Sequence, residues 1–141
     1  MIEPYLFFNG RCEEAANFYR TALGAEITAL MRFKDSPEPC GVGGMPPGTE
    51  EKIMHMNLKV GDAMFMASDG RCTGTANFEG FALSLSPATE ADAHRRFDAL
   101  ADGGKVEMPL GKTFWSPCFG MVTDRFGVTW MINVLPAQAP A

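Results

Sequence analysis

Two polar side chains, His55 and Asn57, interrupt the apolar stretch "KIMHMNLKV" at residues 52–60. Successive side chains of a β-strand point to opposite faces, so residues two apart share one face. A histidine titrates near neutral pH and can act as a general base or anchor a ligand, and the amide can add hydrogen bonds. The alternative is a structural histidine hydrogen-bonded within the sheet. His94, in a charged helical stretch, is typical of a solvated surface residue.

The cysteines form no metal-binding pattern. They are Cys12, Cys40, Cys72 and Cys118. No C-x-x-C pair occurs, so the spacing typical of a zinc site is missing. Free cysteines act more often as small apolar residues than as nucleophiles. No glycine-rich phosphate loop joins a strand to a helix, and no nucleophile-elbow sequence favours a Ser-His-Asp assembly.

Two adjacent aromatic residues, Phe114 and Trp115, precede an apolar strand in "KTFWSPCFG". Aromatic side chains commonly line ligand pockets, so this pair can form a wall or lid over a ligand. The alternative is that the pair closes the hydrophobic core from a loop, since cores bury much aromatic area.

The composition of the 141-residue chain excludes some classes of partner. A net charge of −5 without clustered Lys and Arg predicts no nucleic-acid partner. No apolar run approaches 18 residues, so we expect no membrane span. The stretch "MIEPYLFF" lacks the basic and long apolar segments of a signal peptide, which favours a cytoplasmic location.

The order of expected elements is strand, helix and three strands, and it occurs twice. Apolar residues at three- and four-residue steps predict the helices, and alternating stretches between Gly and Pro predict the strands. The expected helices are 12–24 and 89–104, and the expected strands are 3–10, 26–33, 52–60, 62–68, 81–86, 105–110, 114–124 and 127–133. Two such units complete one core between them, which predicts a single domain over 1–141. The first module is expected at about 1–70, the second at about 79–135, and a frayed tail at 136–141.

Strand alternation separates a face under the helices from a face on the concave side of the sheet. In residues 52–60 Met54, Met56 and Leu58 form an apolar face, which is the first. The second face is mixed and carries Ile53, His55 and Asn57. Aligning Ala15 with Ala93 and Gly61 with Gly127 transfers this labelling between the two halves. The residues that this places in a ligand pocket, with the two loop aromatics, are His55, Asn57, Leu6, Phe8, Phe65, Ser84, Met131, Phe114 and Trp115.

Three segments carry a resemblance to a known family: "PYLFFNGRCEEAANFYRTALGAEI", "IMHMNLKVGDAMFMASD" and "DRFGVTWMINV". With the repeat, they resemble the PhnB-like branch of the glyoxalase, bleomycin-resistance and extradiol-dioxygenase superfamily, also called vicinal oxygen chelates. The resemblance implies an α+β fold in which two βαβββ modules form a cup-shaped, eight-stranded mixed sheet. It also implies a homodimer.

The resemblance also indicates where a metal would bind. Metal-dependent members place His, Gln or Glu on the first and last strands of their modules. The matching positions here are Pro4, Phe65, Ala82 and Met131. Three of these have no donor atom, and a thioether is a poor ligand for a hard or borderline divalent ion. We therefore expect no metal and no other cofactor.

The resulting hypothesis is a protein that binds a small, partly apolar molecule in the cup, as bleomycin-resistance-type relatives do without metal catalysis. The alternative is a metal-dependent lyase, isomerase or dioxygenase with off-pattern ligands, such as His55 with a loop carboxylate. A third possibility is a structural dimer whose cup binds nothing. Some PhnB-like sequences have names that suggest a ubiquinone methyltransferase or a role in phosphonate use, and these residues support neither. Whether a reaction is catalysed stays open.

Overall fold

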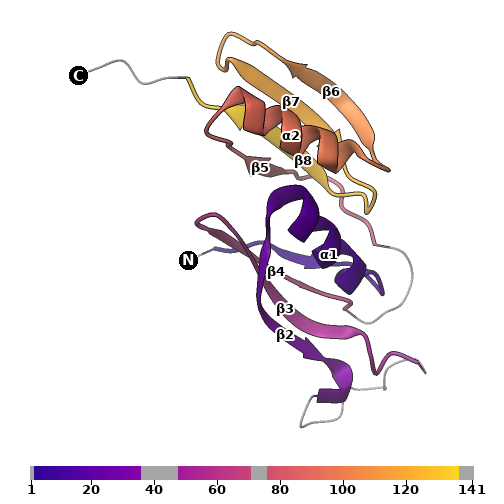
Figure 1. Cartoon of the computed structure of the whole chain (residues 1–141). Coiled ribbons are helices and arrows are strands. Elements are labelled where there is room, and N and C mark those ends of the chain that lie inside the picture. Colours follow the sequence, from indigo (N-terminus) through magenta and orange to yellow (C-terminus); the bar gives the residue numbers. More distant parts are fainter. Residues whose placement is uncertain (1, 36–47, 71–75, 137–141) are drawn as a thin grey trace. The chain divides into compact units, whose positions relative to one another are not determined.

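The computed structural model describes residues 2–35, 48–70 and 76–136. The chain divides into two compact units, Met1–Ala76 and Asn77–Ala141, which are described separately (Figure 1). The first unit contains β1 (Tyr5–Phe7), α1 (Cys12–Leu23), β2 (Glu26–Arg32), a short 3-10 helix η1 (Phe33–Asp35), β3 (Ile53–Val60) and β4 (Ala63–Ser68). The second contains β5 (Leu83–Leu85), α2 (Glu90–Ala101), β6 (Lys105–Gly111), β7 (Cys118–Thr123) and β8 (Thr129–Val134). The predicted βαβββ order in each half is therefore confirmed.

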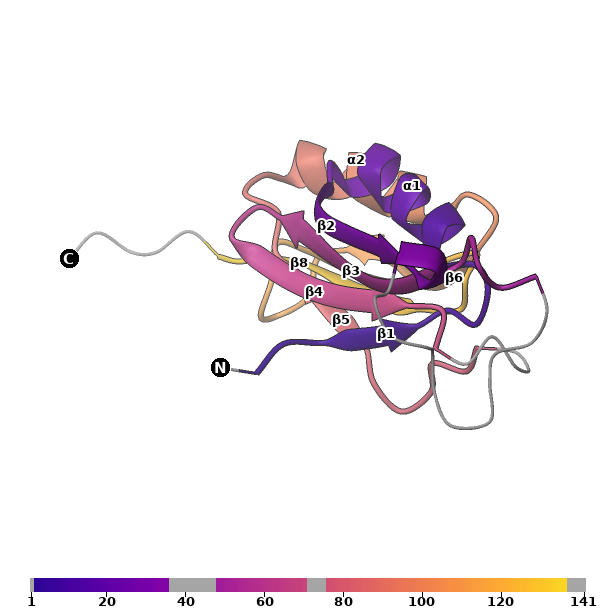
Figure 2. The same ribbon diagram turned by 90° about the horizontal axis from the view of Figure 1, so that it is seen from below.

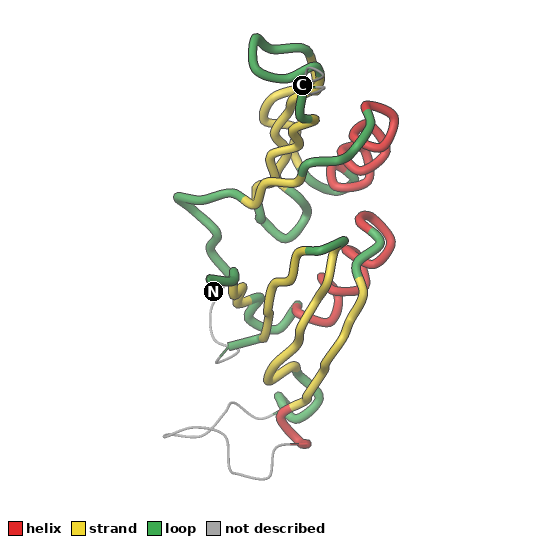
Figure 3. The backbone as a smooth tube through the Cα atoms, turned by 90° about the vertical axis from the view of Figure 1, so that its left-hand side faces the viewer, coloured by secondary structure: helices red, strands yellow, loops and turns green. Residues whose placement is uncertain are grey.

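Each unit has one mixed four-stranded sheet. The strand orders are β1-β4-β3-β2 and β5-β8-β7-β6. In both sheets the first and last strands of the unit pair in parallel, and the remaining neighbours are antiparallel. Within each unit the helix lies against one side of its own sheet, which Figures 2 and 3 show from two directions. None of the helices among the described residues is long and apolar enough to cross a membrane.

The core of the first unit forms around Tyr19 of α1, which is fully buried. Its ring lies 6.4 Å from the Phe8 ring and 6.1 Å from the Phe65 ring. Leu6 is also buried and shares a face of β1 with Phe8, because the two residues are two positions apart. The prediction that Leu6, Phe8 and Phe65 line a pocket is therefore wrong, since all three belong to the side of the sheet that α1 covers.

A difference in turn length explains the error at Phe65, whereas the error at Leu6 and Phe8 comes from the alignment of Ala15 with Ala93. Val60 pairs with Ala63 in the β3–β4 ladder, so only Gly61 and Asp62 form that turn. Thr123 pairs with Thr129 in the β7–β8 ladder, which leaves the five residues 124–128 between the strands. The turns differ by three residues, an odd number, so one offset cannot match the faces of both flanking strands. Aligning the turn glycines matches the faces of β3 and β7 but exchanges those of β4 and β8.

The ladders give the correct correspondence between the halves. Tyr5 pairs with Met66 in the first sheet, and Ser84 pairs with Met131 in the second. Phe65 is buried on the helix-covered face, whereas Met66 and Met131 both lie on the face that points away from the helix. Met66, and not Phe65, is therefore the counterpart of Met131. Their partners in the parallel ladders, Tyr5 and Ser84, correspond in the same way. One residue that the resemblance assigned to the metal-ligand pattern, Phe65, therefore points under a helix.

In the second unit, the predicted division of strand residues between the two faces of the sheet agrees with the structure. Trp130, Ile132 and Val134 are buried, while Thr129, Met131 and Asn133 alternate with them and are half-buried. A Cβ atom at Gly120 would lie 3.0 Å from the ring of Phe97 on α2, so Gly120 belongs to the helix-covered side of β7. Phe119 and Met121 consequently point to the other side.

Candidate functional site

The face of the first sheet that points away from α1, called here the α1-distal face, carries a polar row among apolar side chains. Its members are Tyr5, Phe7, Met31, His55, Asn57 and Met66. The ladder pairs Met31 with His55 and Asn57 with Met66, so residues from all four strands meet on this face. Most of these side chains are half-buried.

Tyr5, His55 and Asn57 form one row of hydrogen bonds. The Tyr5 hydroxyl lies 3.1 Å from Nδ1 of His55, and Nε2 of His55 lies 2.8 Å from Oδ1 of Asn57. An amide oxygen only accepts, so Nε2 carries the proton of the neutral imidazole and Nδ1 accepts the Tyr5 hydroxyl proton. The amide nitrogen of Asn57 and the lone pairs of the Tyr5 oxygen then remain for a ligand.

This row can also move a proton. A ligand that gives a proton to the Tyr5 oxygen would let Tyr5 pass its own proton to Nδ1 of His55. The resulting imidazolium would keep its second N–H on Asn57, which stabilises the charged ring. The arrangement therefore has the parts of an acid–base site as well as those of a binding site.

Tyr5 is the residue that sequence reasoning missed. Its position two residues before Phe7 places both on one face of β1, and their rings lie 4.9 Å apart. The misaligned repeat assigned this face to the core, so the signal was hidden. Phe7 is 53% exposed and Met31 is 37% exposed, which leaves apolar surface beside the polar row.

On the second sheet, Ser84 and Met131 pair directly and lie on the face that points away from α2, called here the α2-distal face. Phe114 is 97% exposed, and its ring contacts that of Trp115 at 4.8 Å. Trp115 in turn lies 5.2 Å from the buried ring of Phe119. Trp115 therefore packs on the sheet itself, while Phe114 extends away from it.

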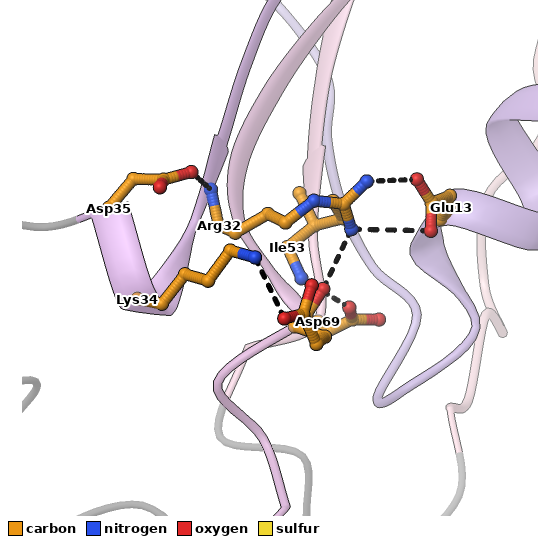
Figure 4. Close-up of polar contacts among 7 residues, drawn as sticks. Glu13, Arg32, Lys34, Asp35, Ile53 and Asp69 are labelled. Atoms are coloured by element: carbon orange, nitrogen blue, oxygen red, sulfur yellow. Dashed lines mark hydrogen bonds and ion pairs between the residues drawn. The ribbon is translucent and has the colours of Figure 1, made fainter.

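A charged hollow of about 650 Å³ lies beside the start of α1 (Figure 4). Arg32 of β2 donates to both carboxylate oxygens of Glu13 and, at 2.7 Å, to the backbone carbonyl of Glu51. The hydrogen bond from the Arg32 guanidinium lowers the pKa of Glu13 below its ordinary value. Lys34 pairs with the Glu51 carboxylate at 2.8 Å. Ion pairs join Arg11 to Glu14, Arg32 to Glu13 and Lys34 to Glu51, and the side chains of these pairs are partly solvated.

Asp69, at the same end of the sheet, has a structural role that its sequence context did not reveal. Its carboxylate is buried and accepts the backbone N–H groups of Gly10 and Cys12 on one oxygen and of Ile53 on the other. Figure 4 shows Asp69 beside Ile53. These contacts join the end of β4 to the start of α1, whose N-cap residue Arg11 makes no side-chain cap.

Burial favours the protonated form of both described cysteine thiols, Cys12 and Cys118. Burial raises the pKa of the Cys12 thiol, and the negative charge of Asp69 raises it further. Burial also raises the pKa of the Cys118 thiol, with a smaller contribution from Glu90. Both thiols therefore stay protonated, as expected of small apolar residues. Cys40 and Cys72 lie outside the described residues. Within residues 2–35, 48–70 and 76–136, no group of three or more His, Cys, Asp or Glu side chains is placed to hold a metal ion.

Comparison with known proteins identifies the family. Residues 1–133 match the family described as 3-demethylubiquinone-9 3-methyltransferase. The chain belongs to this family. It is also 40% identical over 144 residues to Protein YjdN of Escherichia coli K12, covering 97% of both chains.

Solved structures agree with this assignment. Protein PA1353 from Pseudomonas aeruginosa is 46% identical with a TM-score of 0.83, covering 96% of this chain and 97% of that one. A putative 3-demethylubiquinone-9 3-methyltransferase, PhnB protein, from Bacillus cereus is 29% identical with a TM-score of 0.77, covering 94% and 98%. A glyoxalase-related enzyme from Fulvimarina pelagi, 17% identical with a TM-score of 0.60 over 100% and 92%, shares the fold alone. The resemblance to PhnB-like members of the glyoxalase superfamily is therefore confirmed.

Proposed function

We propose that the chain binds a small, partly apolar molecule on the α1-distal face, without one of the metal ions that other branches of the superfamily use. The observation that supports this best is the hydrogen-bonded row Tyr5–His55–Asn57, half-buried beside exposed apolar side chains. Ligand sites typically combine an apolar lining with a few polar groups in fixed positions. The corrected face assignment removes Leu6, Phe8 and Phe65 from this site and adds Tyr5.

The row determines what the ligand must offer. The Asn57 amide nitrogen donates, so it fits a carbonyl or another acceptor of the ligand. The Tyr5 oxygen, with its own proton directed at His55, accepts from an N–H or O–H group of the ligand. Phe7 and Met31 provide apolar surface for the remainder of the molecule. The ligand class is therefore a small molecule with one acceptor, one donor and an apolar body.

Thermal-shift screening of a small-molecule library tests this proposal, because a ligand that binds the folded state raises its melting temperature by mass action. Compounds that stabilise the wild type should stabilise His55→Gln less, because His55 holds the Tyr5 hydroxyl and the Asn57 amide in place, and weakening one ligand hydrogen bond lowers affinity about fivefold. His94→Gln, a change of the exposed histidine on α2, is the matched control and should behave like the wild type. A screen without hits, or hits that stabilise all three proteins equally, would contradict the proposal.

The metal-free part is tested separately. Hits found with protein purified without added metal should keep their effect after treatment with a chelator. If the effect disappears and a divalent ion restores it, the site is metal-dependent and the alternative of a metal-dependent enzyme is favoured. The homodimer stays a prediction, which sedimentation velocity on the purified chain can test.

A further inference from the structure

The Tyr5 hydroxyl has a single proton, and His55 determines where that proton points. The hydroxyl oxygen lies 3.1 Å from Nδ1 of His55, and Nε2 of the same ring lies 2.8 Å from Oδ1 of Asn57. The Asn57 oxygen only accepts, so Nε2 keeps its proton whether the imidazole is neutral or charged. A proton that the ring gains therefore binds at Nδ1, the atom that faces Tyr5.

Gaining this proton reverses the hydrogen bond between the two side chains. Nδ1 of a neutral imidazole accepts, so the Tyr5 hydroxyl donates to it and offers only its lone pairs to a ligand. An imidazolium has a proton on both nitrogens, so Nδ1 donates and the Tyr5 oxygen accepts. The hydroxyl proton then points away from the ring and is available to a ligand. Asn57 offers the same N–H donor in both states.

Few other ionisable groups face His55. Met31 lies directly opposite it on β2, and Met66 of β4 pairs with Asn57, so neither flanking strand places a charge against the ring. α1 lies on the other side of the sheet (Figure 2). Besides Tyr5 and His55, the described ionisable groups on the α1-distal face lie further along the strands, and they are Glu3, Glu26 and Lys59. Histidine side chains ordinarily titrate at about pH 6.5, so the reversal falls within an accessible pH range.

We infer that the charge of His55 selects the class of ligand group that binds at the Tyr5 oxygen: an N–H or O–H donor when the ring is neutral, and a carbonyl or another acceptor when the ring is protonated. The inference rests on the proposed function, because it concerns a ligand on the α1-distal face. Both hydrogen bonds of the row are only partly buried, so the hydroxyl is open to a ligand. Asn57 does not change, so the change in selectivity comes from Tyr5.

Two uncharged probes of similar shape test this selection. Benzamide has a carbonyl acceptor and an N–H donor on a flat apolar ring, and acetophenone has a methyl group in place of the donor. Neither probe titrates between about pH 5.5 and about pH 8, where histidines do, so a change in their relative affinity reports on the protein. In NMR titrations of the full chain, the ratio of the benzamide affinity to the acetophenone affinity should fall about fivefold from the higher to the lower pH, because the benzamide N–H loses its acceptor. A constant ratio, or no binding of either probe, would overturn the inference.

Substitutions assign the effect to individual side chains. The chain has two histidines, so His55→Gln should make the affinity ratio independent of pH. His94→Gln, which changes the exposed histidine of α2, is the matched control and should keep the fivefold change. Tyr5→Phe should abolish the change, since it removes the oxygen whose role is reversed. A ratio that still depends on pH in His55→Gln would overturn the inference.

A measurement without ligand tests the proton positions themselves. The ¹⁵N chemical shifts of the His55 ring show which nitrogen is protonated, and we expect Nε2 alone in the neutral ring. A neutral ring protonated at Nδ1 would overturn the inference. Library compounds that bind beside Tyr5 with preferences independent of pH would also overturn it, yet they would leave the proposed function intact. The two failures are therefore distinguishable.

Discussion

Replacing Asp69 by Asn should strongly destabilise the first unit. The carboxylate is 1% exposed and accepts three backbone N–H groups at 2.7–2.8 Å. An Asn side chain can keep one oxygen towards Gly10 and Cys12. Its NH₂ group then faces the N–H of Ile53, so two donors meet at hydrogen-bond distance. The change alters no volume and isolates the hydrogen-bonding role of this residue.

The expected magnitude follows from these contacts. Losing one buried, charge-assisted hydrogen bond costs about 1.5–3 kcal/mol, and weakening the other two from charged to neutral acceptors adds roughly 0.5 kcal/mol each. We therefore expect Asp69→Asn to lower the free energy of unfolding by about 2.5–4 kcal/mol. This is a large fraction of the 5–15 kcal/mol that is typical of a folded domain, on the order of a third.

Urea denaturation followed by circular dichroism measures this loss. Asp62→Asn, at an exposed position in the turn between β3 and β4, is the matched control and should stay within about 0.5 kcal/mol of the wild type. If Asp69→Asn were as stable as Asp62→Asn, the three N–H groups would have other partners. The role assigned to Asp69 at the start of α1 would then be wrong.

Two further predictions concern close packing and charge. A Cβ atom at Gly104 would collide with the backbone carbonyl oxygen of Thr123, so Gly104→Ala should cost about 1–3 kcal/mol in urea denaturation, whereas Gly111→Ala, with open space around it, should cost much less. Equal losses would refute the packing argument. The hydrogen bond from Arg32 lowers the pKa of Glu13, so its stabilising effect is complete above the ordinary glutamate value of 4.5 and is lost as the pH falls through the lowered pKa. Glu13→Gln should therefore melt slightly lower than the wild type at neutral pH, with the difference disappearing in acid; a difference independent of pH would contradict this.

The sequence was sufficient to predict the elements and part of the site. Helical spacing and strand alternation are local signals, so both helices and all eight strands were expected close to their observed positions. The shared face of His55 and Asn57 follows from the same alternation, and their hydrogen bond agrees with it.

Features that depend on distant parts of the chain could not be predicted. The face of β4 required the lengths of the β3–β4 and β7–β8 turns to be known, and the face of β1 required its register on β4. Errors in these placed Leu6, Phe8 and Phe65 in a pocket instead of the core. Asp69 binds backbone groups 57 and 59 positions earlier, and the Tyr5 hydroxyl meets a ring 50 positions later. Such contacts depend on how strands are ordered in the sheet, which no local pattern encodes.

Soaking crystals of the chain with a library of small fragments is the most direct test of ligand binding on the α1-distal face. Bound fragments should hydrogen-bond to the Tyr5 oxygen or the Asn57 amide nitrogen, with their apolar parts against Phe7 or Met31. Fragments found only elsewhere, for example in the charged hollow beside the start of α1, would contradict the proposed function.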